Sequence, residues 1–415
     1  MLSAAKCLAA AVVTLSMFTT ARAAEPDTPL RVDYQAQLLP DRGLARVSIR
    51  VDGPHLPDAL RLRIDPLRQV NFSSEGKTSM SRGRLVWNPP RSGGSLHYDV
   101  RLEHDRDGPG KDAELTSSWA LFRGGDLFPP MAIEIEPDEE AEASLTLRVP
   151  KDWSVVAPWK RIEGTTFEIE QEHRFFDRPT GWILAGKLGV TREKVAGIKL
   201  AIANPSGHRF HRLDILALLR WTLDDLVDVF PDHPKRFAIV GAGDPMWRGG
   251  LSGPDSLYVH ADRPLISRDG TSPILHEMVH SFMHARAGKD GDWIVEGVAE
   301  YYSLALLRRS RTFSKRRYEK SLEKLAKKGR KAGDLRSPKA DAAIAAQGAV
   351  LMAELNEKIL RATGKKKSLD DVVRVLARER KSVETARFQE IVKEVAGTGF
   401  DEFFAQALQP RSSNK

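Results

Sequence analysis

The sequence predicts an α+β protein of more than one domain, in which an antiparallel β-sandwich-like part is followed by a helical part. Two patterns support this prediction. Between residues 30 and 202, short runs alternate apolar and polar residues, which is the period of half-buried strands. From residue 213 onward, most apolar residues recur at the spacing of amphipathic helices. A chain of 415 residues is also too long for one compact core, so we expect two or three domains.

The first 24 residues have the order of a secretory signal peptide. Lys6 precedes an apolar run over residues 8–18, and the segment Ala-Arg-Ala follows at residues 21–23. We therefore expect cleavage near Ala23 or Ala24 and a periplasmic or secreted protein. The run of about eleven apolar residues is too short to span a bilayer, and no later stretch reaches the roughly twenty residues that spanning requires.

The single cysteine, Cys7, lies inside this predicted signal peptide. The mature chain then contains no thiol, which excludes a disulfide framework and a thiolate metal site. Any metal ion must be held by histidine, aspartate or glutamate. Export into a bacterial periplasm fits this composition best.

Residues 25–203 are expected to form the β-rich N-terminal domain. Strands are predicted where apolar and polar residues alternate, at residues 47–51, 60–64, 145–149 and 167–170. Turn-rich stretches lie between them, for example at residues 88–90 and 106–110. Short strands separated by such turns favour an antiparallel, sandwich-like arrangement.

Residues 204–310 are expected to form the second domain. The pattern changes at residues 204–207, Asn-Pro-Ser-Gly, and residues 213–230 have the spacing of an amphipathic helix that Pro231 ends. Strands are expected at residues 237–240 and 256–260. Two helices follow these strands, and they carry the histidines and glutamates of the predicted metal site described below.

Residues 311–415 are expected to form a helical C-terminal region, with helices near residues 314–328, 342–361, 368–378 and 400–408. Fourteen lysines and arginines stand between Arg308 and Lys339 against three acidic residues. We interpret this excess as the solvated face of a surface helix and predict no nucleic-acid partner. The alternative interpretation is a contact with a nucleic acid or an anionic surface.

Residues 276–280, His-Glu-Met-Val-His, have the His-Glu-x-x-His pattern. On a helix, residues i and i+4 project side by side, so His276 and His280 can share one metal ion. A helix is expected here because Thr271 or Ser272 can cap its start and Pro273 fits its first position.

A third ligand is expected from a second helix. Fifteen residues separate His280 from Glu296, which lies in the helical pattern of residues 293–302. Two imidazoles and one carboxylate leave the fourth position of a tetrahedral zinc ion open for water, as in catalytic sites. Glu277 can then take a proton from the zinc-bound water as it attacks a carbonyl. Glu300 can accept the outer N–H of a ligating histidine.

His284 continues the same helical face and is a further histidine to consider. The alternative metalloprotease pattern places its last histidine six residues after His280, and that position is Arg286. We therefore expect His284 to pack against the protein or to face the substrate, rather than to bind the metal.

The pairing of His276-Glu277-x-x-His280 with Trp293-x-x-Glu296-Gly297 resembles the gluzincin metallopeptidases, in particular the glycyl aminopeptidase-like and aminopeptidase N-like families. The resemblance implies a β-rich N-terminal domain, a thermolysin-like catalytic domain of the zincin type and a helical tail. It also implies one zinc ion per chain and a peptide or protein substrate. We expect this substrate to lie along residues 256–260.

Two positions depart from these families. Residues 249–253 resemble a Gly-x-Met-Glu-Asn segment, whose glutamate holds the substrate's amino group in the aminopeptidases, but Ser252 takes that place. Ala345 takes the place of a tyrosine that stabilises the oxyanion. The candidates near in sequence for the tyrosine's role are Tyr258, His260, Tyr301 and Tyr302, and the sequence does not choose among them.

The sequence therefore predicts an exported zinc metallopeptidase that hydrolyses peptide bonds, with aminopeptidase and endopeptidase action both open. The first alternative is a zinc-binding pseudopeptidase, weak or inactive in catalysis, that acts as a binding or assembly protein. The loss of two assisting groups favours this alternative, whereas the intact Glu277 opposes it. The second alternative is a β-sandwich adaptor that holds no stoichiometric zinc. No oligomeric state is predicted.

Overall fold

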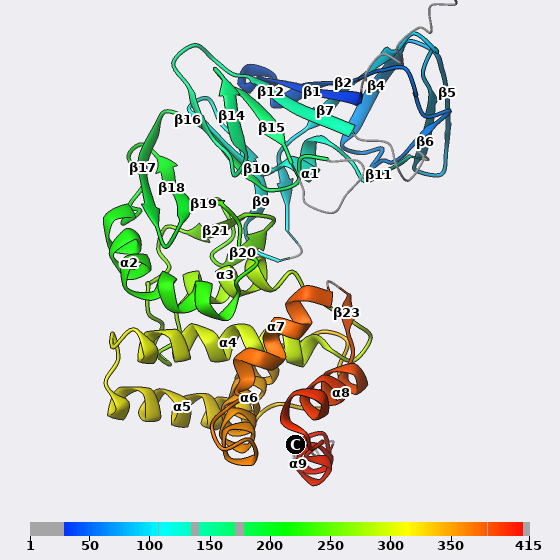
Figure 1. The fold of residues 1–415 in the computed structure, drawn as a ribbon. Coiled ribbons are helices and arrows are strands. Elements are labelled where there is room, and N and C mark those ends of the chain that lie inside the picture. The colour runs from blue at the N-terminus through cyan, green and yellow to red at the C-terminus, as the bar shows by residue number, and fades with distance from the viewer. Residues whose placement is uncertain (1–28, 107, 134–140, 171–177, 380, 410–415) are drawn as a thin grey trace, which may run out of the picture.

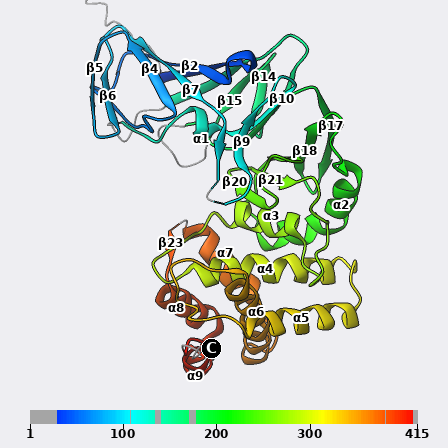
Figure 2. The ribbon, with the colours of Figure 1, turned by 180° about the vertical axis from the view of Figure 1, so that it is seen from behind.

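The computed structural model describes residues 29–106, 108–133, 141–170, 178–379 and 381–409. The predicted signal peptide, residues 1–24, lies outside them. Along the described chain, a group of β-sheets is followed by a mixed sheet with two helices and then by layers of helices (Figure 1). The view from behind shows the N-terminal sheets at one end of the molecule and the C-terminal helices at the other (Figure 2).

Three sheets make up the described N-terminal part. The seven-stranded sheet has the order β14 (Lys160–Glu163), β15 (Thr166–Ile169), β12 (Ala141–Arg148), β1 (Leu30–Leu39), β2 (Leu44–Asp52), β7 (Gly94–Arg101) and β4 (Gln69–Ser74). The five-stranded sheet has the order β13 (Ser154–Val156), β16 (Trp182–Gly186), β10 (Trp119–Arg123), β9 (Lys111–Leu115) and β8 (His104–Asp105). The four-stranded sheet has the order β11 (Met131–Ile133), β3 (Leu60–Arg63), β6 (Arg84–Asn88) and β5 (Lys77–Ser81). A 3-10 turn (Pro40–Arg42) and the short helix α1 (Gly124–Leu127) connect strands of these sheets.

The strands bury the faces that their alternation predicts. In β1, Val32, Tyr34 and Ala36 are buried, whereas Arg31 and Gln37 are exposed. Buried apolar residues from all three sheets meet in one core. Each fully buried aliphatic side chain stabilises such a core by about 1.5–3 kcal/mol. Adjacent strands of these sheets run antiparallel, apart from β1 and β12, which pair in parallel.

A mixed five-stranded sheet follows, with the order β17 (Leu188–Val195), β18 (Ile198–Pro205), β19 (Arg236–Ala242), β21 (Ser256–His260) and β20 (Gly250–Gly253). The predicted division between residues 203 and 204 falls inside β18, and β18 pairs with both β17 and β19. Because one sheet continues across this point, we propose that the second unit begins with β17. The helix predicted at residues 213–230 is α2 (Arg212–Val229).

The remaining helices are α3 (Pro273–Met283), α4 (Asp292–Arg309), α5 (Lys315–Gly329), α6 (Ala342–Ala362), α7 (Leu369–Glu379), α8 (Thr385–Ala396) and α9 (Asp401–Ala407), and β22 (Arg286–Ala287) pairs with β23 (Ser382–Val383). Six of these helices, α3, α4, α5, α6, α7 and α9, lie where the sequence predicts them. The sequence does not predict α8. None of the helices within the described ranges combines the length and the hydropathy that crossing a bilayer requires.

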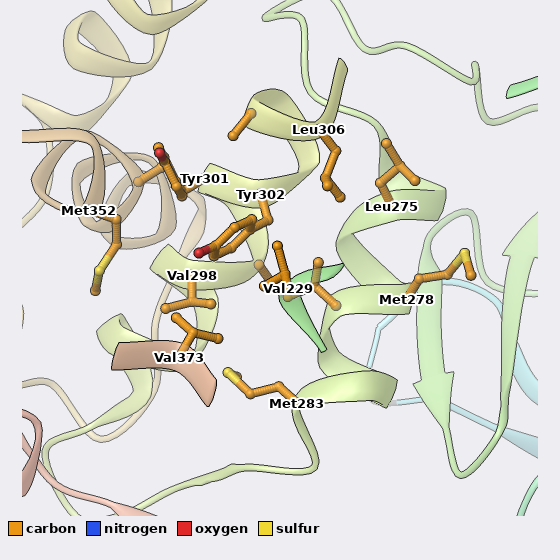
Figure 3. Close-up of a cluster of buried hydrophobic side chains, with 14 of the residues drawn as sticks. Val229, Leu275, Met278, Met283, Val298, Tyr301, Tyr302, Leu306, Met352 and Val373 are labelled. Carbon is orange, nitrogen blue, oxygen red and sulfur yellow. The ribbon is translucent and has the colours of Figure 1, made fainter. Parts of the chain in front are cut away.

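One apolar cluster joins the mixed sheet to the C-terminal helices. Figure 3 shows its centre, to which α3 contributes Leu275 and Met278, α4 contributes Leu306, α6 contributes Met352 and α7 contributes Val373. The predicted division between residues 310 and 311 falls in the α4–α5 connection, but this cluster runs from α2 to α9. The helices therefore share one core with the sheet that positions α3.

A second, smaller cluster joins the N-terminal part to the other face of the mixed sheet. Trp119 and Leu121 of β10 and Trp182 of β16 pack against Val240 of β19 and Tyr258 of β21. The N-terminal part is thus fixed directly on the sheet that carries β20 and β21.

Candidate metal centre

The helix α3 carries the His-Glu-x-x-His segment. The hydroxyl of Ser272 accepts a hydrogen bond from the backbone N–H of Leu275 at the start of the helix, and Pro273 occupies its first turn. Burial of Leu275 and Met278 turns one side of α3 into the core. The helix ends at Met283, because His284 adopts a left-handed conformation with φ of 51°.

Three side chains from α3 and α4 converge on one point. The Nε2 atoms of His276 and His280 lie 3.1 Å apart. Oε2 of Glu296 lies 3.4 Å from Nε2 of His276, and Oε1 of Glu296 lies 3.4 Å from Nε2 of His280. Within the described part of the chain, these three residues form the one group of histidines and carboxylates whose ligand atoms lie close enough to hold a metal ion.

The spacing of these atoms fits zinc. Ligands at about 2.05 Å from a tetrahedral zinc ion are separated from one another by about 3.3 Å. The two imidazole nitrogens lie 3.1 Å apart, and each lies 3.4 Å from one of the two oxygens of Glu296, so the separations are close to this value. Two imidazole nitrogens that face each other at 3.1 Å must share a proton or a cation. Two nitrogen ligands and one oxygen ligand are also a donor set that zinc accepts.

The helix α4 supplies a second carboxylate behind this group. Glu300 lies one turn beyond Glu296, and its Oε2 lies 3.0 Å from Nδ1 of His276. With the Nδ1–H donating to this carboxylate, the lone pair of Nε2 points to the convergence point. Glu300 thereby fixes both the ring orientation and the tautomer of His276.

Charge pairing dominates the electrostatics of the group. Burial by itself would lower the pKa of His276, but hydrogen bonds with Glu296 and Glu300 outweigh it and raise this pKa well above its ordinary value. Burial would raise the pKa of Glu296, but hydrogen bonds from His276 and His280 hold this pKa well below its usual range. The carboxylate of Glu296 is therefore ionised and available as a ligand at neutral pH.

Glu277 lies between the two histidines in sequence, and its side chain lies against Gly250 of the strand β20. A β-carbon placed on Gly250 would come within 3.1 Å of Cγ and Oε1 of Glu277. Glycine is the residue that permits this close approach of backbone to carboxylate. No local pattern in the sequence distinguishes Gly250, because its contact with Glu277 is tertiary.

The strand β20, rather than β21, is the edge of the mixed sheet next to Glu277, and β17 forms the opposite edge. The expectation that a substrate lies along residues 256–260 is wrong, because β21 is already paired with β19 on one side and β20 on the other. The N–H of His260 donates to the carbonyl of Gly249, which turns Gly249, Leu251 and Gly253 toward β21 by the alternation of an antiparallel ladder. Gly250 and Ser252 then present their backbone groups to the open edge.

The candidates for an oxyanion donor are mostly engaged elsewhere. The hydroxyl of Tyr258 donates to the carbonyl of Trp247, and that of Tyr302 donates to Asp370. His260 is buried and lies 3.5 Å from Asp244. Tyr301 and Tyr302 lie within the packed helical core (Figure 3).

Several solved structures have a fold similar to that of this chain. The structure resembles an aminopeptidase N family protein from Idiomarina loihiensis, with 17% identity, 92% of this chain and 76% of that chain covered, and a TM-score of 0.71. It also resembles a mutant M1 zinc metallopeptidase from Deinococcus radiodurans bound to a Tyr-Ser-Ala substrate (15% identity, 93% and 95% covered, TM-score 0.61). A third similar structure is native yeast LTA4 hydrolase (14% identity, 95% and 71% covered, TM-score 0.60).

No family model and no curated protein matches the sequence. At these identities the structural likeness establishes the fold. The chain has the multidomain fold of the M1 zinc metallopeptidases, and the predicted gluzincin-like architecture of a β-rich N-terminal part followed by a helical C-terminal part is confirmed.

Proposed function

We propose that this protein is an exported metallopeptidase in which His276, His280 and Glu296 hold one zinc ion. The observation that carries the proposal is the convergence of His276, His280 and Glu296, whose imidazole nitrogens and carboxylate oxygens lie 3.1–3.4 Å apart, with Glu277 nearby against the edge strand β20. When bound, zinc would polarise a substrate carbonyl and make water a stronger acid. The fold shared with M1 zinc metallopeptidases supports this reading.

The residues of the chain divide the remaining work. Glu277 accepts a proton from the attacking water and delivers it to the nitrogen of the departing amine, which is the role of a general base and then of a general acid. Glu300 keeps His276 in the orientation and tautomer that ligand binding requires. The outward backbone groups of Gly250 and Ser252 pair with an extended peptide, as an edge strand permits.

A peptide substrate is supported by the Tyr-Ser-Ala substrate in the similar Deinococcus radiodurans structure. Ser252 bears no charge to pair with a free amino terminus, so nothing at this position of β20 confines cleavage to the first bond. Export is supported by the order of residues 1–24, and we expect the mature chain to begin at Ala24 or Glu25.

The test is digestion of a diverse peptide library by the zinc-loaded mature protein, read by mass spectrometry. Glu277→Gln removes the proton acceptor while leaving the three ligands in place. Glu354→Gln makes the same change on the exposed surface of α6 and serves as the control. We expect cleavage by the unmodified and Glu354→Gln proteins and none by Glu277→Gln. The new termini will show whether the enzyme trims ends or cuts internally.

The proposal fails if the unmodified protein, shown by metal analysis to hold one zinc ion, leaves the library intact. The zinc-binding pseudopeptidase would then be the better description. Ser252 and Ala345, which stand where two assisting groups are expected, are the specific observation that favours this second candidate. Absence of stoichiometric zinc would exclude both descriptions and leave the adaptor.

A further inference from the structure

The open strand β20 is short and is paired along one side only. It contains four residues, all half-buried, and it contributes the edge of the sheet next to Glu277. Short edge strands open easily, because few hydrogen bonds hold them. Contacts other than the ladder with β21 are therefore needed to keep the outward groups of Gly250 and Ser252 in place.

The side chain of Trp182, from the N-terminal part, provides such a contact. Its Nε1–H donates to the carbonyl of Leu251 in the middle of β20, at 3.0 Å. Its backbone N–H donates to the hydroxyl of Ser256 at the start of β21, at 2.9 Å. Its ring lies 5.2 Å from that of Tyr258. A β-carbon on Gly253 would come within 3.1 Å of the same ring, so Trp182 contacts both strands of the hairpin.

A second contact from the N-terminal part holds the segment that leads into β20. The backbone N–H of Trp247 donates to the carbonyl of Lys111, and the N–H of Lys111 donates to the carbonyl of Pro245. The guanidinium of Arg106 lies 3.9 Å above the ring of Trp247, which covers Gly249. The start of β20 is therefore anchored, and the anchor at its middle is Trp182.

We infer that Trp182 is a positioning residue for substrate binding: the N-terminal β-rich part, through this indole N–H, holds the substrate-pairing edge of the catalytic sheet in register. The inference rests on the proposed function for its kinetic consequence. Without the indole N–H, the carbonyl of Leu251 keeps only its place in the ladder, and β20 leaves the sheet more often. A peptide that pairs with β20 must then also restore it, which weakens binding more than it slows the chemical step.

The variant Trp182→Phe tests this inference, because it keeps an aromatic ring and removes the donor. Trp87→Phe is the matched control. Trp87 is also fully buried, and its Nε1–H donates to the carbonyl of Glu75 at 2.7 Å, within the N-terminal core. Both variants thus lose an indole, a buried volume and one hydrogen bond to a backbone carbonyl. They differ in the position of that carbonyl, which lies in β20 for Trp182 and between β4 and β5 for Trp87.

Two readouts separate the inference from the proposed function. Hydrogen–deuterium exchange at residues 249–253 should accelerate about fivefold in Trp182→Phe and stay unchanged in Trp87→Phe, since one neutral hydrogen bond is worth about that factor. With a cleaved peptide as the substrate, KM should rise about two- to fivefold in Trp182→Phe, with kcat nearly constant and zinc content unchanged. Equal exchange in the two variants would overturn the inference whether or not the protein is a peptidase. If the protein cleaves peptides and Trp182→Phe has the same KM as Trp87→Phe, the inference is also overturned. If exchange is faster in Trp182→Phe but the unmodified protein cleaves no peptide, only the proposed function is refuted.

Discussion

Replacing Glu300 tests whether the carboxylate behind His276 tunes the metal site. The hydrogen bond from Nδ1 of His276 to Glu300 is 3.0 Å long, and the two side chains are only 16% and 12% exposed, so water screens it weakly. Removing a partner of this kind weakens metal binding by about ten- to a hundredfold, or about 1.4–2.8 kcal/mol. Glu300→Gln keeps an acceptor for the Nδ1–H but loses the charge, so we expect about tenfold weaker zinc binding. Glu300→Ala loses both, and we expect about a hundredfold.

The assay is competition for zinc against a chromophoric chelator at fixed pH and ionic strength. Glu354→Gln on α6 is the control, because it removes the same charge at an exposed position and should leave the affinity unchanged. Circular dichroism of the metal-free proteins will establish that each variant is folded. Zinc affinity of Glu300→Ala within about twofold of the unmodified protein would refute the role assigned to Glu300.

Two further predictions concern stability. Gly297→Ala should lower the free energy of unfolding, measured in urea, by about 1–3 kcal/mol, because the new β-carbon would lie 2.8 Å from backbone atoms of α6. This loss is expected even though alanine is the better helix former. Gly333→Ala is the control, and because the space around Gly333 is open it should change this free energy by less than about 0.5 kcal/mol. Burial would raise the pKa of Asp269, but hydrogen bonds and the ammonium of Lys328 outweigh it and lower this pKa. The contribution of Asp269 to the free energy of unfolding is therefore present above its unfolded pKa near 3.8. This contribution is lost as the pH falls through the lower folded pKa. We therefore expect the difference in free energy of unfolding between the unmodified protein and Asp269→Asn to become smaller as the pH falls from about 6 to about 3, as measured by urea unfolding. A difference that grows toward low pH would contradict the stabilising role of the Asp269 carboxylate.

Periodic patterns in the sequence predicted most of the helices and six of the strands. The residues of β2, β3, β12 and β15 alternate, and those of α2 repeat at the helical spacing, because each pattern depends on which face of one element is buried. The helix α8 escaped prediction, although it buries Phe388 and Ile391 in the common core. The division expected at residues 203 and 204 followed a local change of period. In the structure, one sheet continues through β18, because its pairing with β17 and β19 depends on backbone hydrogen bonds and not on the local period of apolar residues.

The sequence by itself determined what depends on residues a few positions apart. A spacing of four on a helix brings His276 and His280 side by side wherever that helix packs, and the same spacing places Glu296 and Glu300 on one face of α4. These relations follow from the geometry of one helix, so no other part of the chain is needed to derive them.

The tertiary structure decided what depends on distant segments meeting. It placed Glu296 within 3.4 Å of both histidines, made β20 rather than β21 the open edge, and brought Trp182 to the carbonyl of Leu251. Such contacts arise because the apolar faces of whole elements bury one another, and this burial is summed over residues far apart in the chain. A local pattern states which face of an element will be buried, but the partner that buries it is fixed only when all the elements pack together.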